Sequence, residues 1–160
     1  MNRDNSRRIS AIALPAALVC AFSASSQAGE WSANASMTSN YIWRGLTQTE
    51  NEAAVQGGID YAGDSGFYIG TWASNVNYGA GDVYSYEHDI YAGFAFDTGD
   101  ISWDVGYLYY NYDKEAEFDF SEVYIGVGIG NFSAQYNVLA DTEADEAPGQ
   151  DFGFGEAYYL

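Results

Sequence analysis

The chain has 160 residues, enough for one domain, and carries 23 acidic against five basic side chains, a formal net charge of −18 at pH 7. This charge repels the phosphates of nucleic acids, which excludes nucleic acid as a partner. An acidic chain can be disordered, but 15 tyrosines and four tryptophans argue against disorder here, and 18 glycines with only two prolines are typical of β-structure.

The first 28 residues have the three parts of a secretory signal peptide. A basic start with three arginines comes first, residues 9–24 are mostly apolar, and Ser26-Gln27-Ala28 is a small-residue cleavage site. The apolar part is shorter than the ~20 residues that a membrane-spanning helix needs. We therefore expect export and a mature domain of residues 29–160. The single cysteine, Cys20, falls in the leader, so the mature domain has no disulfide.

Apolar residues alternate with polar or small residues along the mature domain, and no long stretch has a helical period. In residues 101–110, for example, every odd position carries Ile, Trp, Val or Tyr. The runs have about the length that a tilted strand needs to cross a bilayer, ~9–11 residues. The predicted strands are residues 54–62, 67–75, 88–97, 101–110, 122–129 and 132–138, with a first strand starting at Glu30 and a last one over 152–160.

The two faces of these strands differ in chemistry. One face is aliphatic and aromatic, and the other carries Gly, Tyr, Ser, Asn, Gln and carboxylates. A soluble sandwich turns the apolar face inward, whereas a membrane barrel turns it toward lipid. Alternation alone does not distinguish the two. The signal peptide, the many tyrosines and the scarcity of lysine, which protects soluble edge strands, favour the membrane barrel.

The linkers between the predicted strands alternate in length. They are long at 46–53, 76–87, 113–119 and 141–150, and short at 63–66, 98–100 and 130–131. Transmembrane barrels have short periplasmic turns and longer extracellular loops, which produces this alternation when the N-terminus is periplasmic. The sequence therefore predicts an all-β fold, an antiparallel up-and-down transmembrane β-barrel in the cell outer membrane with about eight strands present.

The end of the chain bears on the completeness of this barrel. The last predicted strand stops at Tyr158-Tyr159-Leu160 without the terminal aromatic residue, commonly phenylalanine, on which complete barrels end. We therefore expect residues 29–160 to be a fragment that lacks the closing strands of the barrel.

Three stretches resemble a known family. They are Thr38-Ser39-Asn40-Tyr41-Ile42-Trp43-Arg44-Gly45-Leu46-Thr47-Gln48, Val55-Gln56-Gly57-Gly58, and Gly66-Phe67-Tyr68-Ile69-Gly70-Thr71-Trp72-Ala73-Ser74-Asn75-Val76. They resemble the TorF porin family of proteobacteria, and shorter segments up to about residue 140 are similar to it as well. Members of that family run longer at the C-terminus. The resemblance implies an outer-membrane pore of undefined substrate and supplies no catalytic residues.

Charged side chains on the polar face are the candidates for lining a pore. The acidic candidates are Asp60, Asp89, Asp104 and Glu122, and Arg44 is the only cation predicted among the strands. Arg44 is expected near the outer end of the first strand. It is a selectivity residue, or it pairs with a strand or loop carboxylate and pins the strand; the two roles are compatible.

The sequence offers few candidates for catalysis or metal binding. His88 is the only histidine, and Ser85 beside it lies in no nucleophile motif, so we expect no enzyme, no catalytic residue and no cofactor. The acidic loops at 113–119 and 141–146 could bind Ca²⁺ or Mg²⁺ together with lipopolysaccharide phosphates, but they lack the pattern of an EF-hand and are expected to be solvated. No protein-bound metal is therefore predicted.

The function expected from these patterns is passive diffusion of small solutes or ions through an outer-membrane, porin-like channel with a weak preference for cations. The alternative is a non-conducting structural or adhesive surface barrel with a plugged lumen; an outer-membrane enzyme is a third class. The expected partners are outer-membrane lipid, lipopolysaccharide and the permeating solutes. The sequence leaves open the solute and the oligomeric state. It also leaves open whether the polar-face glycines free space in the lumen or let tyrosines fold across them.

Overall fold

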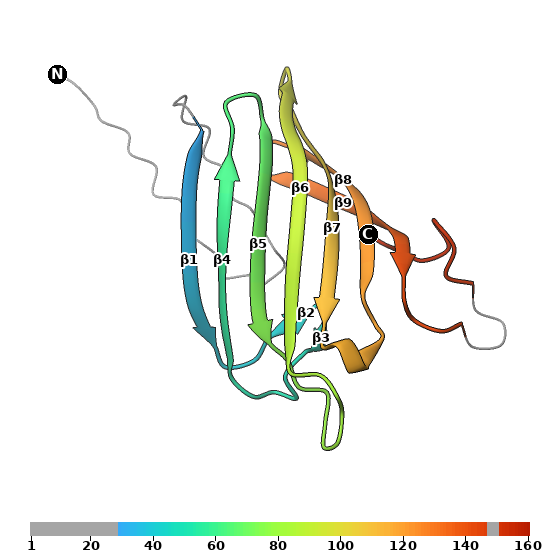
Figure 1. The fold of residues 1–160 in the computed structure, drawn as a ribbon. Helices are drawn as coiled ribbons and strands as arrows, with labels where there is room; N and C mark the ends of the chain where they lie inside the picture. The colour runs from blue at the N-terminus through green and yellow to red at the C-terminus, as the bar shows by residue number, and fades with distance from the viewer. Residues whose placement is uncertain (1–28, 147–150) are drawn as a thin grey trace.

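The computed structural model describes residues 29–146 and 151–160 (Figure 1). The predicted signal peptide and residues 147–150, which include Pro148, lie outside the described residues. The elements are β1 (Glu30–Thr38), β2 (Ile42–Trp43), β3 (Leu46–Thr47), β4 (Ala54–Ala62), β5 (Phe67–Asn75), β6 (Tyr86–Thr98), β7 (Ile101–Tyr112), the 3-10 turn η1 (Lys114–Ala116), β8 (Phe120–Ile129), β9 (Phe132–Thr142) and β10 (Tyr158–Tyr159).

Eight of the strands form one antiparallel sheet in the order β1-β4-β5-β6-β7-β8-β9-β10. Apart from the step from β1 to β4, each strand pairs with the next one in the sequence, so the sheet is a meander. The prediction of an all-β antiparallel fold is confirmed. In the described part of the chain β1 and β10 are the two edges of the sheet, and no hydrogen-bonded pairing joins them.

The predicted turns and loops are found between β4 and β9. The short turns begin at Gly63, Gly99 and Gly130, and the last two adopt positive φ angles of 66° and 62° that glycine tolerates without strain. Longer linkers at residues 76–85 and 113–119 lie at the other end of the sheet. Within the described ranges, no helix is long and apolar enough to span a membrane.

The first and last predicted strands differ most from the structure, and β6 to β9 are each two to four residues longer than predicted. The first strand ends at Thr38, and the segment after it forms a separate two-stranded hairpin of β2 and β3, so Arg44 does not lie on the first strand. Thr38 accounts for the break, because its hydroxyl bonds the carbonyl of Asn40 at 3.0 Å and competes with strand pairing. The last predicted strand is reduced to the two residues of β10, which pair with Val138 and Asn137 of β9.

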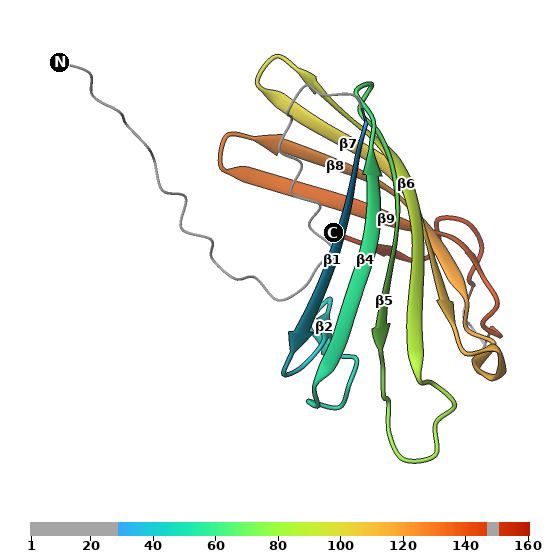
Figure 2. The ribbon, with the colours of Figure 1, turned by 60° about the vertical axis from the view of Figure 1, so that its left-hand side comes forward.

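The sheet curls, so that β8 and β9 cross the direction of β1 and β4 in both views (Figures 1 and 2). Tyr68 on β5 contacts Asp104 on β7 and Tyr124 on β8 by hydrogen bonds, although these strands are not neighbours of β5. A curled sheet brings such strands closer together on its concave side, and the side chains on this face are largely buried. The face that carries these polar side chains is therefore the inner one, and we call it the polar face.

The convex side carries the apolar residues. On β6, Glu87, Asp89 and Tyr91 are buried on the polar face, whereas Ile90 and Phe94 between and beyond them remain 45% and 42% exposed. The same holds along the sheet for Val55, Ile59, Ile69, Phe96, Ile125 and Ile129. The predicted separation of a polar and an apolar face is thus present, with the polar face inside.

Asp113 fastens the loop end of β6 to the end of β7. Its carboxylate accepts hydrogen bonds from the Ser85 amide at 2.5 Å, the Ser85 hydroxyl at 2.8 Å and the Tyr86 amide at 3.1 Å. Partial burial raises the pKa of the Asp113 carboxyl, but these hydrogen bonds together outweigh burial and lower it. The carboxylate form is therefore favoured by folding.

We expect Asp113→Asn to lower the free energy of unfolding by about 0.5–1 kcal/mol at neutral pH, because charge-assisted hydrogen bonds are lost at a solvent-exposed site. Since folding lowers this pKa, the contribution is complete above the unfolded value of about 4 and disappears as the pH falls through the folded value. Urea unfolding between pH 7 and pH 3 measures the difference. Asp100→Asn, in an exposed turn at the opposite end, is the control, and equal losses in both variants at pH 7 would contradict the role of Asp113.

Candidate functional site

The polar face brings together all five residues predicted to line a pore. Asp60, Asp89, Asp104 and Glu122 lie on β4, β6, β7 and β8, and Arg44 reaches the same face from the β2–β3 hairpin. One row of residues paired across the sheet runs from Asp60 through Gly70, Tyr91 and Leu108 to Glu122. Their grouping follows from period-two alternation together with the register of the sheet.

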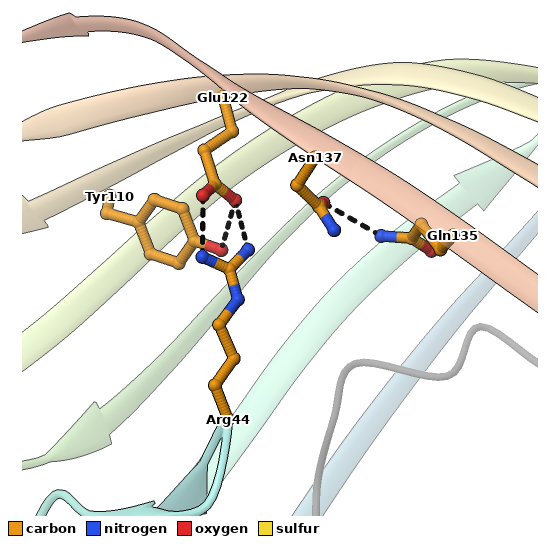
Figure 3. A network of polar contacts seen from close by, with 5 residues as sticks. All are labelled: Arg44, Tyr110, Glu122, Gln135 and Asn137. Atoms are coloured by element: carbon orange, nitrogen blue, oxygen red, sulfur yellow. Dashed lines mark hydrogen bonds and ion pairs between the residues drawn. The ribbon is translucent and has the colours of Figure 1, made fainter. Parts of the chain in front are cut away.

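Arg44 and Glu122 form a bidentate ion pair (Figure 3). Arg44 Nη1 donates to Glu122 Oε1 at 2.6 Å and Nη2 to Oε2 at 2.5 Å, and the Tyr110 hydroxyl donates to Oε2 at 3.2 Å. The guanidinium carbon lies 4.2 Å from the ring centre of Trp43 and 4.6 Å from that of Tyr159. Planar guanidinium groups suit both kinds of contact, so Arg44 joins the hairpin, β8 and β10. The pairing role considered for Arg44 is confirmed.

Glu87, which falls in the predicted linker at residues 76–87 and was not a predicted pore-lining residue, is a further buried carboxylate. It is the first inward-facing residue of β6 and is 2% exposed. The Tyr41 hydroxyl donates to its Oε1 at 2.7 Å and the Tyr112 hydroxyl to its Oε2 at 2.9 Å. Burial, and then the neighbouring Glu87 carboxylate, raise the pKa of Tyr41 above its ordinary value, so this hydroxyl remains a neutral donor. Extending the alternation of β6 by two residues before Asp89 would have found Glu87.

Tyrosine rings lie across the glycines of the polar face. Tyr91 lies over Gly70 and its hydroxyl donates to Asp60, and a side chain at Gly70 would collide with the ring. On the next row Tyr68 on β5 and Tyr124 on β8 lie over Gly93 and Gly106 of the two strands between them.

The hydroxyls of Tyr68 and Tyr124 meet above these glycines, and Tyr68 also donates to Asp104 at 2.5 Å. The glycines at 70, 93 and 106 therefore accommodate rings instead of leaving space, which answers a question that the sequence left open.

Asp89 differs from the other carboxylates. It is 4% exposed, sits between Trp72 and Tyr110 in its row, and its Oδ1 has no hydrogen-bond partner within the described residues. Of the buried carboxylates Glu87, Asp89 and Glu122, only Glu122 forms an ion pair within the described residues, and its partner is Arg44. The polar face therefore carries an excess of negative charge and one buried acceptor that the described part of the protein does not use.

The residues weighed for other chemistry lie apart from this cluster. His88 faces the opposite side of β6 from Glu87 and Asp89 and its Nε2 lies 2.7 Å from the Thr71 hydroxyl, while the Ser85 hydroxyl donates to Asp113. Ser85 and His88 therefore have separate partners. No group of three or more His, Cys, Asp or Glu side chains in the described ranges is arranged to hold a metal ion.

Comparison with protein families gives one match. Residues 23–155 match the family described as a bacterial protein of unknown function, Gcw_chp. The protein belongs to the Gcw_chp family. The match spans the sheet from β1 to β9 and includes both Arg44 of the hairpin and Glu122 of β8. Comparisons with curated proteins and with solved structures give no match. The description of the Gcw_chp family assigns no activity, so the resemblance to TorF porins stays a prediction.

The ion pair of this Gcw_chp chain gives a prediction about stability. Arg44→Gln leaves Glu122, whose side chain is 6% exposed, without its cation. We expect a loss of about 3 kcal/mol in the free energy of unfolding. This value is at the lower end of the range for removing one partner of a buried ion pair, because the Arg44 side chain is 18% exposed. The double variant Arg44→Gln/Glu122→Gln should lose less than the two single losses added together. Urea unfolding of the four proteins measures this coupling.

Lys114→Gln is the matched control, because Lys114 is an exposed cation in η1. It should change the free energy of unfolding by less than about 0.5 kcal/mol. A coupling energy near zero, or equal effects of Arg44→Gln and Lys114→Gln, would contradict a stabilising role of the pair.

Proposed function

We propose that the protein is an outer-membrane channel of the β-barrel type that passes small solutes or ions by diffusion, with a weak preference for cations. The observation that carries the proposal is the inverted arrangement of the sheet. Carboxylates and tyrosines are buried on its concave face, and aliphatic and aromatic side chains are exposed on its convex face. In a transmembrane barrel the apolar face meets lipid and the polar face lines the lumen.

The convex face supports a membrane setting. Val55, Ile59, Ile125 and Ile129 are 45–61% exposed, and with their neighbours they extend over most of the sheet. Soluble monomers rarely expose apolar patches of this extent, whereas hydrocarbon removes them from water. Strands β4 to β9 have 9 to 13 residues, about the length needed to cross a bilayer as tilted strands.

A barrel in lipid has no open edge, since unpaired backbone groups are costly in hydrocarbon. The proposal therefore requires that the free edge of β1 is paired when the protein lies in the membrane. The predicted signal peptide supports export, and the resemblance to TorF porins supports a pore. Outer-membrane lipid and lipopolysaccharide are the surrounding partners in this proposal.

The charges of the polar face support cation preference. Asp60, Glu87, Asp89, Asp104 and Glu122 face inward, and within the described residues the one ion pair on this face joins Arg44 to Glu122. Carboxylates lining a channel favour cations. The loops at residues 113–119 and 141–146 add negative charge at one end, which concentrates cations within a Debye length of ~8 Å at physiological salt.

A second candidate function is a non-conducting structural or adhesive surface barrel. The packing of the polar face favours it, because tyrosine rings cover Gly70, Gly93 and Gly106 and the hairpin lies over the same face. Barrels of about eight strands fill their interior with side chains, whereas larger ones leave water.

Reversal potentials in a KCl gradient across a planar bilayer test the proposal. We expect a preference for cations that fades as salt rises. The preference should increase in Arg44→Gln, because positive charge is removed, and decrease in Glu122→Gln, because negative charge is removed. Asp64→Asn, in an exposed turn at the other end of the sheet, is the control and should leave the potential unchanged. An anion-selective pore would contradict the charge argument, and the absence of conductance would favour the surface barrel.

A further inference from the structure

The β2–β3 hairpin has a turn that its sequence does not favour. Ile42 pairs with Thr47 and Trp43 with Leu46, which leaves Arg44 and Gly45 as the two turn residues, with φ angles of 46° and 84°. Two-residue turns with positive φ at both positions favour Asn, Asp or Gly at the first of them. Arginine is strained there, so contacts of its side chain must offset the strain.

Those contacts are made by the guanidinium group. It binds Glu122 of β8 with two hydrogen bonds (Figure 3). It also lies over the rings of Trp43 and of Tyr159 on β10. The backbone of the tip has no such packing, because a side-chain carbon placed on Gly45 would meet no atom within 4 Å, and Leu46 is 67% exposed. Arg44, together with the ring of Trp43 against Tyr110, therefore holds the tip against the sheet.

The base of the hairpin is fastened elsewhere. The Tyr41 hydroxyl binds Glu87 at 2.7 Å, and its ring lies 5.4 Å from that of Trp72 on β5. The amide of Asn77, in the loop after β5, binds the Gln48 carbonyl at 2.8 Å. The hairpin thus extends over the polar face from β5 and β6 at its base to β8 at its tip.

We propose that the hairpin of Ile42–Trp43 and Leu46–Thr47 is the constriction of the passage and that the Arg44–Glu122 ion pair is the contact that keeps the passage narrow. This inference rests on the proposed channel function. Arg44 is a positioning residue: it acts by keeping the hairpin on the wall formed by β8. When the pair is broken, the base remains attached at Glu87 and the tip moves off the polar face, which widens the passage.

Two variants break the pair in different ways. Arg44→Asn removes the guanidinium but places a favoured residue in the turn, so the hairpin itself is retained. Glu122→Gln removes the charge from the wall and leaves the turn unchanged. Lys114→Asn, at an exposed cation in η1, is the matched control.

Hydrogen exchange of the full chain in lipid vesicles, followed for residues 41–48, reports release of the tip, and single-channel conductance in KCl reports the width of the passage. In both variants we expect exchange in the hairpin to rise at least about tenfold, which corresponds to about 1.4 kcal/mol, with β5 and β6 still protected. Conductance should rise at least about twofold in both variants, because the released tip leaves a wider path for ions. The control should change neither exchange nor conductance.

The outcomes separate the two proposals. Faster exchange in the hairpin without conductance in any protein, the wild type included, would contradict the channel, and with it a constriction. A conducting wild type whose variants show unchanged exchange would contradict the role of the Arg44–Glu122 ion pair in holding the hairpin and would leave the channel function standing. Faster exchange with unchanged conductance would show that the hairpin does not constrict the passage. Should Arg44→Asn lose protection throughout the sheet, Glu122→Gln decides by the same criteria.

Discussion

Carboxylates that are removed from water need hydrogen-bond donors, and the concave face of this sheet supplies them mainly with tyrosine hydroxyls. Glu87 takes Tyr41 and Tyr112, Asp60 takes Tyr91, and Asp104 takes Tyr68. Tyr91 and Tyr68 reach carboxylates two strands away, so their rings lie flat across the strand between, which requires a position without a side chain there. The glycines at 70, 93 and 106 meet this requirement, and so the composition of the polar face and the curl of the sheet depend on each other.

Glu122 accepts from a tyrosine as well, Tyr110, but its main partner is an arginine that comes from outside the main sheet. This ion pair holds the tip of the hairpin on the polar face and connects the N-terminal segment to β8 and β10. The same contact is therefore structural and, in our proposal, sets the width of the passage. Asp89 keeps an unused buried oxygen among the described residues, beneath this part of the face.

The sequence predicted what depends on local pattern. Period-two alternation identified the two faces, and glycines such as Gly99 and Gly130 marked the short turns correctly. The hairpin was missed, because Ile42-Trp43-Arg44 continues the pattern of a strand and Arg44-Gly45 lacks the usual first residue of a tight turn.

Contacts between strands that are not neighbours, such as Tyr68 with Tyr124, depend on how far the sheet curls. Curl is a property of the whole sheet that no local pattern encodes. For the same reason the alternation could suggest a barrel but could not give its closure.

In the proposed channel the convex face of the sheet meets lipid, and the concave face does not. Residues 29–160 contain no cysteine, so single spin labels can be placed on β8 at Val123, Ile125 and Val127 on one face and at Gly126 and Gly128 on the other. A carbon added at Gly126 or Gly128 meets its neighbours at ordinary contact distances of 3.5 Å or more, so labels there begin without a clash. The labelled proteins are studied in vesicles of outer-membrane lipid, with oxygen, which concentrates in hydrocarbon, and a water-soluble nickel chelate as relaxing agents. We expect oxygen to relax the labels at 123, 125 and 127 more than the chelate does. At 126 and 128 we expect the opposite preference or none. The reverse alternation, or no alternation along β8, would contradict this orientation of the sheet.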